Sequence, residues 1–241
     1  MQTTTSPELY LGCAGWSLPR EQWPRFDAEG SHLQRYASRF SAVEINSSFY
    51  RPHRPATYAR WASSVPAGFR FSVKVPKQIT HEARLQGCEA ALDEFLTQCT
   101  ALGQHLGCLL VQLPPSLAYD PPTAAAFFEH VRTRYSGTLV LEPRHPSWVR
   151  AADVLKALHI GWVEADPAPL GETGPLGWDG VVYIRLHGSP KIYYSAYEEP
   201  VLRATSERLA ASSVPAWCVF DNTAAGAAVA DALWVLEHLR G

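Results

Sequence analysis

Eight short apolar stretches, each ending at a polar or charged residue, constrain the fold of this chain more than any other feature. They span residues 9–14, 42–46, 69–75, 108–113, 138–142, 160–166, 181–187 and 216–221. Short runs that are apolar nearly throughout are typical of parallel strands buried on both faces. Because helix-like segments follow most of these runs, the alternation predicts an α/β fold in which eight parallel strands close into a (β/α)8 TIM barrel.

The segments between the strands support this arrangement and indicate one irregularity. Apolar residues recur at helical spacing across 92–99 and 229–236, and more weakly across 153–158 and 202–209. Segment 167–179 is rich in Gly and Pro, which predicts a loop where a barrel would carry its helix between strands six and seven. No low-complexity tract or Gly/Ser linker divides the 241 residues, so we expect a single domain over the whole chain.

Composition narrows the class of protein further. The formal net charge is −2, so the chain has no global basic field for nucleic acid, although a local basic groove stays open. The five cysteines form no C-x-x-C pair and are odd in number, which favours buried thiols in a reducing compartment over disulfides. The sequence has no signal-peptide pattern at its start and no run of 18 apolar residues, so we expect a cytoplasmic protein without a membrane span.

The polar residues at the strand ends are expected to converge. Side chains alternate along a strand, so the seventh strand would point Tyr183, Arg185 and His187 into the barrel. The same alternation predicts further inward residues at Glu44, Asn46, Arg70, Ser72, Lys74, Gln112, Glu142, Glu164 and Asp166. The upper barrel would then hold Glu44, Glu142, Asp166 and Asp221 against Lys74, Arg144 and Arg185, at the C-terminal mouth where this fold carries its active sites.

Two interpretations of this charged mouth stay open. Buried ionisable groups must pair with one another, bind a ligand, or do both, because an unpaired buried charge is very costly. A structural salt-bridge network that plugs the mouth would satisfy them. The number of ionisable groups favours a functional site, because barrel interiors are normally filled by Val, Ile and Leu.

The loop after the seventh strand is a second candidate feature. Loops after strands seven and eight commonly hold phosphate in this fold, and here Gly188 would allow close backbone approach while Lys191 would supply charge. Tyr193, Tyr194 and Tyr197 follow and could stack on a sugar or base. An ordinary turn with tyrosines packed on the rim explains the pattern equally well.

Metal, cofactor and nucleophile signals are weaker. The histidines His81, His145 and His187, with the carboxylates, are ligand types for a divalent metal, but no H-x-x-x-H or H-E-x-x-H spacing occurs. A metal is therefore possible but not favoured beside three cationic side chains. No nucleotide-cofactor motif and no G-x-S-x-G elbow is found. Cys13 ends the first strand and is interpreted as a buried, inert thiol.

Several aromatic residues recur near the expected mouth. Each is individually more typical of packing, and together they could form an apolar wall for a ring-shaped ligand. They are Trp16, Trp23, Phe49, Tyr50 and Trp148.

An ordered set of motifs covering nearly the whole chain resembles the YecE-like family, a TIM-barrel domain of unknown function (DUF72). The motifs are Gly15-Trp16-Ser17, 43–50 (VEINSSFY), 71–74 (FSVK) with 79–81 (ITH), 112–116 (QLPPS), 142–148 (EPRHPSW), 185–188 (RLHG) and 220–223 (FDNT) before Gly226. Ser48 stands where the family usually has Thr, and Pro143 where an aromatic or aliphatic residue is usual. The resemblance implies the barrel and brings no established activity.

The leading hypothesis is an enzyme, of hydrolase or isomerase type, that acts on a small polar or anionic substrate such as a sugar or phosphate ester. Candidate catalytic residues are Glu44, Glu142, Arg185, His187 and Asp221, with a glutamate as acid or base and His187 as proton shuttle. Candidate substrate-binding residues are Trp16, Asn46, Tyr50, Lys74, His81, Gln112, Arg144, His145, Trp148, Asp166, Lys191, Tyr194 and Asn222.

Two rival hypotheses remain. One is a nucleic-acid-binding or phosphodiester-cleaving protein similar to endonuclease IV-type barrels, in which rim aromatics and local cations engage bases and backbone. The other is a non-catalytic protein whose charged mouth binds a metabolite. The sequence fixes neither the substrate nor the oligomeric state.

Overall fold

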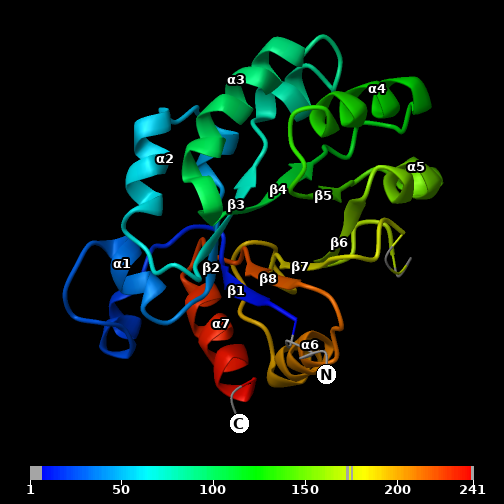
Figure 1. The fold of residues 1–241 in the computed structure, drawn as a ribbon. Coiled ribbons are helices and arrows are strands. Elements are labelled where there is room, and N and C mark those ends of the chain that lie inside the picture. Colours follow the sequence, from blue (N-terminus) through cyan, green and yellow to red (C-terminus); the bar gives the residue numbers. More distant parts are fainter. Residues whose placement is uncertain (1–6, 172–173, 175, 240–241) are drawn as a thin grey trace, which may run out of the picture.

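The predicted barrel is present in the computed structural model, which describes residues 7–171, 174 and 176–239 (Figure 1). Eight parallel strands alternate with helices in the order of the sequence. The strands are β1 Leu9–Cys13, β2 Ala42–Ile45, β3 Arg70–Lys74, β4 Leu106–Gln112, β5 Thr138–Glu142, β6 Ile160–Asp166, β7 Val182–Leu186 and β8 Ala216–Phe220. They form one sheet in the order β1-β8-β7-β6-β5-β4-β3-β2, so each strand lies beside its neighbour in sequence.

Helices surround this sheet, and the four predicted helical segments all fall in helices. The longer helices are α1 His32–Ala37, α2 Pro55–Ala62, α3 Glu89–Cys99, α4 Pro121–Arg132, α5 Ala152–Ala157, α6 Glu199–Ala210 and α7 Ala227–His238. Short helical turns cover Arg20–Arg25, Ser47–Phe49, Gln78–Glu82, Thr100–His105 and Pro146–Ala151. Among the described residues no helix lies between β6 and β7, as the Gly and Pro content predicts.

Local sequence signals explain where individual helices begin. The Ser31 side chain accepts a hydrogen bond from the Gln34 backbone, and the Gln34 side chain accepts one from Ser31, which forms a capping box for α1. The Asp120 carboxylate accepts a hydrogen bond from the Thr123 backbone N–H at the start of α4, where proline occupies the first turn. These caps satisfy N–H groups that helix geometry leaves without intrahelical partners.

The barrel closes between β1 and β2 through side chains as well as backbone. The Tyr36 hydroxyl accepts from the Cys13 N–H at 2.7 Å and donates to the Ala42 carbonyl at 3.0 Å, so it bridges the two strands. A direct bridge joins the strands only at Ala14 and Glu44. Gly12 permits this closure, because a Cβ there would lie 1.9 Å from the Ala42 carbonyl oxygen.

The core has two layers that follow from the alternation along each strand. The larger layer fills the space between sheet and helices, with residues such as Val43, Leu109 and Leu141. The smaller layer fills the barrel below the mouth and consists of Tyr10, Ala14, Ala42, Cys108, Leu110, Val140, Val163, Val181, Tyr183, Trp217 and Val219. The alternation predicted for β2, β3, β4, β5 and β7 is confirmed by this partition.

The alternation predicted for β6 is wrong. Val163 belongs to the inner layer and Ala165 packs against it, so Glu164 and Asp166 point outward. Glu164 pairs with Arg208 of α6 at 2.8 Å, and Asp166 accepts a hydrogen bond from the Tyr197 hydroxyl at 2.9 Å. Among the described residues no helix connects β6 to β7, and α6 leaves a cavity against β6, so polar side chains can face outward here instead of into the barrel.

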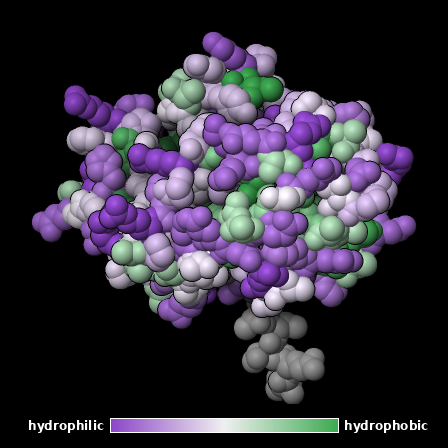
Figure 2. Space-filling view, turned by 90° about the horizontal axis from the view of Figure 1, so that it is seen from above, coloured by the Kyte–Doolittle hydropathy of each residue, from purple (hydrophilic) through white to green (hydrophobic). Residues whose placement is uncertain are grey.

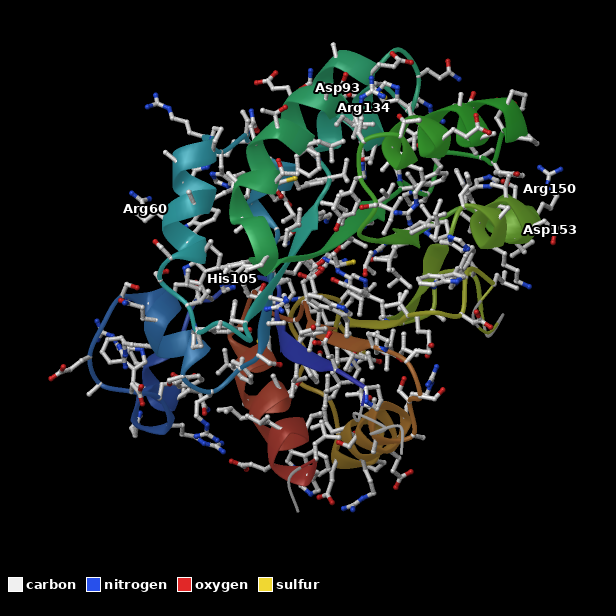
Figure 3. The ribbon with its side chains drawn as sticks, viewed as in Figure 1. Arg60, Asp93, His105, Arg134, Arg150 and Asp153 are labelled. Carbon is white, nitrogen blue, oxygen red and sulfur yellow. The ribbon has the colours of Figure 1, made fainter. Side chains whose placement is uncertain are left out.

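The exterior is mixed in character. The face in Figure 2 is mostly hydrophilic with scattered hydrophobic residues, as is normal for a folded domain. Exposed ion pairs cross between helices, and Figure 3 shows Asp93 of α3 beside Arg134, which follows α4. In the described part of the chain, no helix has the length and apolar character needed to span a membrane.

Candidate functional site

Arg185 is the centre of the ionisable cluster at the C-terminal ends of the strands. It is fully buried, and its guanidinium donates to Glu44 through Nε at 3.0 Å and through Nη2 at 2.7 Å. Nη1 donates to Glu142 at 3.0 Å, and Nη2 lies 2.9 Å from Asp221. The residues come from β7, β2, β5 and the end of β8. The predicted convergence of residues distant in sequence is therefore present around one planar cation.

Electrostatics within this cluster favour the ionised forms of Arg185, Glu142 and Asp221. Burial raises the pKa of the Glu142 carboxyl, but Arg185, His187 and Arg144 outweigh burial and hold that pKa well below its usual range. For Asp221, burial likewise raises the pKa, but Arg185 and His187 outweigh burial, so the pKa lies below its ordinary value. Burial lowers the pKa of Arg185, yet its three carboxylate partners hold it well above the ordinary value.

Because its donors are occupied by carboxylates, Arg185 organises the floor of the site and holds the carboxylates in place. The layer beneath continues the hydrogen bonding, since the Tyr183 hydroxyl donates to Glu44 at 3.1 Å and lies 2.8 Å from Ser72 Oγ. The salt-bridge interpretation therefore describes the deep layer of the mouth. Residues above that layer decide whether a ligand can also bind.

His187 has hydrogen-bond partners for both of its protonation states. Its Nδ1 lies 3.1 Å from Asp221, and its Nε2 lies 3.0 Å from Glu142 Oε1 and 3.1 Å from Arg144 Nη2. When Nε2 is protonated it donates to Glu142, and when it is bare it accepts from Arg144. Burial lowers the pKa of His187, but hydrogen bonds to Asp221 and Glu142 raise it above the ordinary value. A proton can thus be gained or lost at Nε2 without loss of hydrogen bonding.

Lys74, at the end of β3, is the cation of this cluster that has no direct carboxylate partner in the described chain. Its side chain is only 6% exposed, yet Nζ makes no hydrogen bond or ion pair with any described residue. Nζ lies 4.2 Å from the centre of the Phe49 ring. Burial and the neighbouring Arg185 lower the pKa of Lys74 to about 8, although Glu44, Asp221 and Glu142 raise it in part.

Two amide side chains at the ends of the strands on either side of β3 carry unsatisfied acceptors. The Oδ1 atom of Asn46 and the Oε1 atom of Gln112 are buried and have no hydrogen-bond partner in the described chain. Gln112 ends β4 and Asn46 directly follows β2, so both sit at the mouth near Lys74 on β3. Buried polar atoms are almost always paired, and unpaired ones require an explanation such as a ligand.

Arg144 and His81 flank this group at its outer side. Arg144 is 17% exposed and donates to Glu142 at 2.6 Å. The His81 ring packs edge-on against Phe49 at 4.9 Å, and its Nδ1 bonds Thr80 Oγ1 at 2.8 Å. Burial lowers the pKa of His81, and the charges of Lys74 and Arg144 lower it further. His81 therefore lies within electrostatic range of both Lys74 and Arg144.

Most of the expected aromatic wall does not line this site. Trp148 is fully buried in the outer core layer, where its Nε1 donates to the Leu117 carbonyl at 2.9 Å, so it packs outside the Arg185 cluster. Trp16 is half-buried and packs against Trp61. Tyr50 is 68% exposed beside Phe49. Of these aromatic residues, only Phe49 contacts a residue of the ionisable cluster.

The loop after β7 is built for packing more than for holding phosphate. The Gly188 N–H already donates to the Tyr197 hydroxyl at 2.8 Å, and a Cβ on Gly188 would lie 3.0 Å from Asn222. Lys191 is exposed and covers the Tyr194 ring at 4.1 Å. The Asn222 amide nitrogen donates to the Ser195 carbonyl and to Asp231, which leaves only its Oδ1 without a partner.

The remaining polar residues lie at the edge of the site or outside it. His145 accepts a hydrogen bond from the Ser147 backbone N–H and so caps the turn Pro146–Ala151. Asp231 of α7 is not among the site residues that the sequence indicates. Asp231 is 5% exposed, and its carboxylate accepts a hydrogen bond from the Asn222 amide nitrogen at 2.7 Å. A charged residue inside the apolar pattern of the last helix was the signal that could have revealed it. Among the described residues, no group of three His, Cys, Asp or Glu side chains is arranged to hold a metal.

A cavity of about 430 Å³ lies between β6, β7 and α6. Its lining includes Trp162, Leu170, Ile184 and Val201, together with the outward-facing Asp166 and Glu142 of the ionisable cluster. Asp166 therefore lines this cavity and makes no ion pair with Arg185 in the described chain.

These features define a single-domain (β/α)8 barrel protein with a buried ionisable cluster at the C-terminal ends of its strands. Residues 10–241 match the family described as protein of unknown function DUF72, and the chain belongs to that family.

Relatives and solved structures agree with this assignment. The chain is 29% identical to the UPF0759 protein YecE of Escherichia coli K12 over 154 residues, which is 64% of this chain and 54% of YecE. It is 29% identical to the UPF0759 protein YunF of Bacillus subtilis over 44% of this chain and 40% of YunF. The matched region thus spans about half the length of these curated relatives or less.

Two solved structures of DUF72 family proteins share the fold. One from Thermotoga maritima superposes with a TM-score of 0.79 at 23% identity, covering 97% of this chain and 100% of that one. One from Enterococcus faecalis gives 0.80 at 20% identity, covering 97% and 96%. At these identities the likeness shows the barrel and nothing about the reaction.

Proposed function

We propose that this protein is an enzyme that binds a small anionic, hydroxyl-bearing substrate at the C-terminal mouth of its barrel and moves a proton through His187. The observation that carries the proposal is Lys74, a residue that is 6% exposed and whose ammonium has no hydrogen-bond or ion-pair partner in the described chain. A buried cation without a direct partner is costly, and an anionic ligand would remove that cost.

The charge balance of the mouth supports an anion. Three carboxylates, from Glu44, Glu142 and Asp221, are engaged by Arg185, Arg144 and His187 at 2.6 to 3.1 Å. Lys74 is additional to these pairs. With Lys74 and His187 protonated, the described cluster carries one more positive than negative charge, which favours a negatively charged guest.

Hydrogen-bonding capacity supports hydroxyl groups on the same guest. The buried acceptor atoms of Asn46 and Gln112 need donors, and the hydroxyl groups of a sugar would supply them. His187 would then act as acid or base beside the bound substrate, because Glu142 and Arg144 serve its two protonation states. A sugar phosphate combines these requirements, and isomerisation or hydrolysis are the reaction types to test first.

Thermal shift and calorimetry with ribose 5-phosphate, inorganic phosphate and uncharged ribose test this proposal. We expect the two anions to stabilise the wild type, and Lys74→Met and Arg144→Met each to weaken ribose 5-phosphate binding tenfold or more. Lys77→Met is the matched control, because Lys77 is 47% exposed and pairs with Glu82 outside the cluster. Equal binding by Lys74→Met and wild type would refute the proposal.

Measurements of oligonucleotide binding and of turnover separate the rival functions. Exposed rim tyrosines such as Tyr50 and Tyr194 are what nucleic-acid binding would require, and that hypothesis predicts oligonucleotide affinity that falls steeply with salt. Ligand binding without turnover across a panel of sugar phosphates would favour the non-catalytic alternative.

A further inference from the structure

Lys74 differs from every other lysine of this chain in its surroundings. The sequence holds four lysines, at positions 74, 77, 156 and 191. Lys77, Lys156 and Lys191 are exposed, whereas Lys74 is 6% exposed. Lys74 ends β3 at the mouth, its ammonium lies 4.2 Å from the centre of the Phe49 ring, and it is within electrostatic range of Arg185 and the three carboxylates that Arg185 binds.

These surroundings are those of a lysine kept partly neutral. Burial removes water from the ammonium, and Arg185 opposes its charge, while Glu44, Asp221 and Glu142 offset these effects only in part and form no direct ion pair with it. The resulting pKa of about 8 leaves roughly 300-fold more free amine at neutral pH than an ordinary lysine has. A free amine is a nucleophile, and its preferred target among metabolites is a carbonyl carbon.

Resting on the proposed function above, we infer that Lys74 forms a covalent imine with the aldehyde or ketone group of an anionic carbonyl substrate. The lysine is buried and unpartnered, and acid–base groups stand around it, so the geometry carries the assignment. Arg144 would hold the anionic group, since its guanidinium is 17% exposed toward the opening. Asn46 and Gln112 would accept hydrogen bonds from the hydroxyl groups next to the carbonyl.

The step balances without an added reagent. The Lys74 ammonium first gives up a proton, and the amine lone pair then attacks the carbonyl carbon, so that a C–N bond forms and the carbonyl π electrons move to oxygen. That oxygen takes up two protons, one of them returned from the mouth, and leaves as water when the C–O bond breaks and a C=N bond forms. The sum is carbonyl plus ammonium giving iminium plus water, with no oxidation or reduction.

The imine would explain why acid–base groups surround this lysine. A protonated imine withdraws electrons from the adjacent carbon and makes its C–H bond acidic, which is the chemistry of isomerisation and of carbon–carbon cleavage. His187 Nε2 can take up or release a proton in place, and the pKa of His81 is lowered by burial and by Lys74 and Arg144, which favours its basic form. The substrate class is therefore an open-chain sugar phosphate or an oxo acid.

Borohydride trapping tests the inference on the wild-type protein. The protein is incubated at pH 7.5 with dihydroxyacetone phosphate, with pyruvate, or with uncharged dihydroxyacetone, then reduced, and the adduct is located by peptide mass spectrometry. We expect one adduct per chain on the peptide that carries Lys74, formed with at least one of the anionic probes and about tenfold faster than with dihydroxyacetone. Lys77, Lys156 and Lys191 should be labelled at least tenfold more slowly.

Variants and binding data make each outcome decisive. Lys74→Arg should abolish the adduct, and Lys77→Arg should retain it. If phosphate and ribose 5-phosphate stabilise the protein but no Lys74 adduct forms, the imine is refuted while the proposed function stands. If neither binding nor adduct is found, both are refuted. Labelling spread evenly over the four lysines also refutes the imine, and this readout on wild type does not depend on how well the variants fold.

Discussion

The substitution Arg185→Met tests the account of the ionisable cluster most directly. It removes a fully buried cation and leaves three buried carboxylates, from Glu44, Glu142 and Asp221, without their shared partner. Four contacts of 2.7 to 3.0 Å disappear. Removal of one partner from a buried ion pair costs about 3–5 kcal/mol, and methionine has a similar stem, so lost packing adds little.

The expected loss is a large share of the total free energy of unfolding. A domain is typically stable by about 5–15 kcal/mol, so the variant should lose about a fifth or more of its free energy of unfolding at pH 7. Equilibrium urea unfolding followed by circular dichroism measures this loss. The matched control is Arg203→Met on α6, because Arg203 is 52% exposed and pairs only with Glu199, and exposed pairs contribute at most about 1 kcal/mol.

The deficit should also depend on pH. In the wild type the pKa values of Glu142 and Asp221 are lowered, so their stabilisation is present at neutral pH and is lost as pH falls through their folded-state pKa values. In the variant, burial without Arg185 favours the protonated carboxyls, so the variant loses less on acidification. The difference between the two proteins should therefore narrow as the pH falls below about 4, the unfolded-state pKa of a carboxyl group. A deficit below about 1 kcal/mol at pH 7, or one that does not shrink below about pH 4, would refute the reasoning.

Three further predictions concern other parts of the molecule. Gly12→Ala should destabilise the barrel strongly in thermal unfolding, because the new Cβ would lie 1.9 Å from a β2 carbonyl oxygen, whereas Gly68→Ala, with no atom within 4 Å, should not. The Cys13 thiol should not react with DTNB at pH 8 in the folded protein, since burial raises its pKa to about 12, and it should react in urea. The His187 imidazole should titrate by NMR above its ordinary 6.5, so the stability it adds is present at low pH and is lost as pH rises through the folded-state value.

Each of these has a clear contrary result. Equal melting temperatures for the two glycine variants would contradict the closure geometry between β1 and β2. Rapid labelling of Cys13 in the native state would show that the thiol is accessible. A His187 titration at or below the ordinary value would show that Asp221 and Glu142 do not outweigh burial.

The sequence predicts the inward set correctly where apolar neighbours settle the phase of the alternation. On β7, Val182, Ile184 and Leu186 are apolar and need the helix layer, so Arg185 and His187 had to face inward. On β6 the same logic failed for Glu164 and Asp166. Their orientation depends on whether a helix covers the outer face, and that is a property of the neighbouring layer and not of the strand.

The roles of the aromatic residues show a similar limit. A tryptophan that follows a strand end is equally compatible with a ligand wall and with packing, and nothing local to Trp148 distinguishes the two. Its burial and its bond to Leu117 depend on a segment 31 residues away. Likewise, the sequence marks Gly188 as a close-approach glycine, but only the fold shows that its N–H is already used by Tyr197.

By itself, the sequence determined the barrel, its single domain and the set of ionisable residues at the strand ends, because periodicity along each strand and helix is a local property of the chain. Only the tertiary structure decided which of those residues pair. Arg185 satisfies three carboxylates and Lys74 none directly, and that division rests on distances of a few ångströms between strands that are far apart in sequence. Hydrogen bonds and ion pairs fall off over such distances, so the chemistry of the mouth is fixed by how the strands pack together.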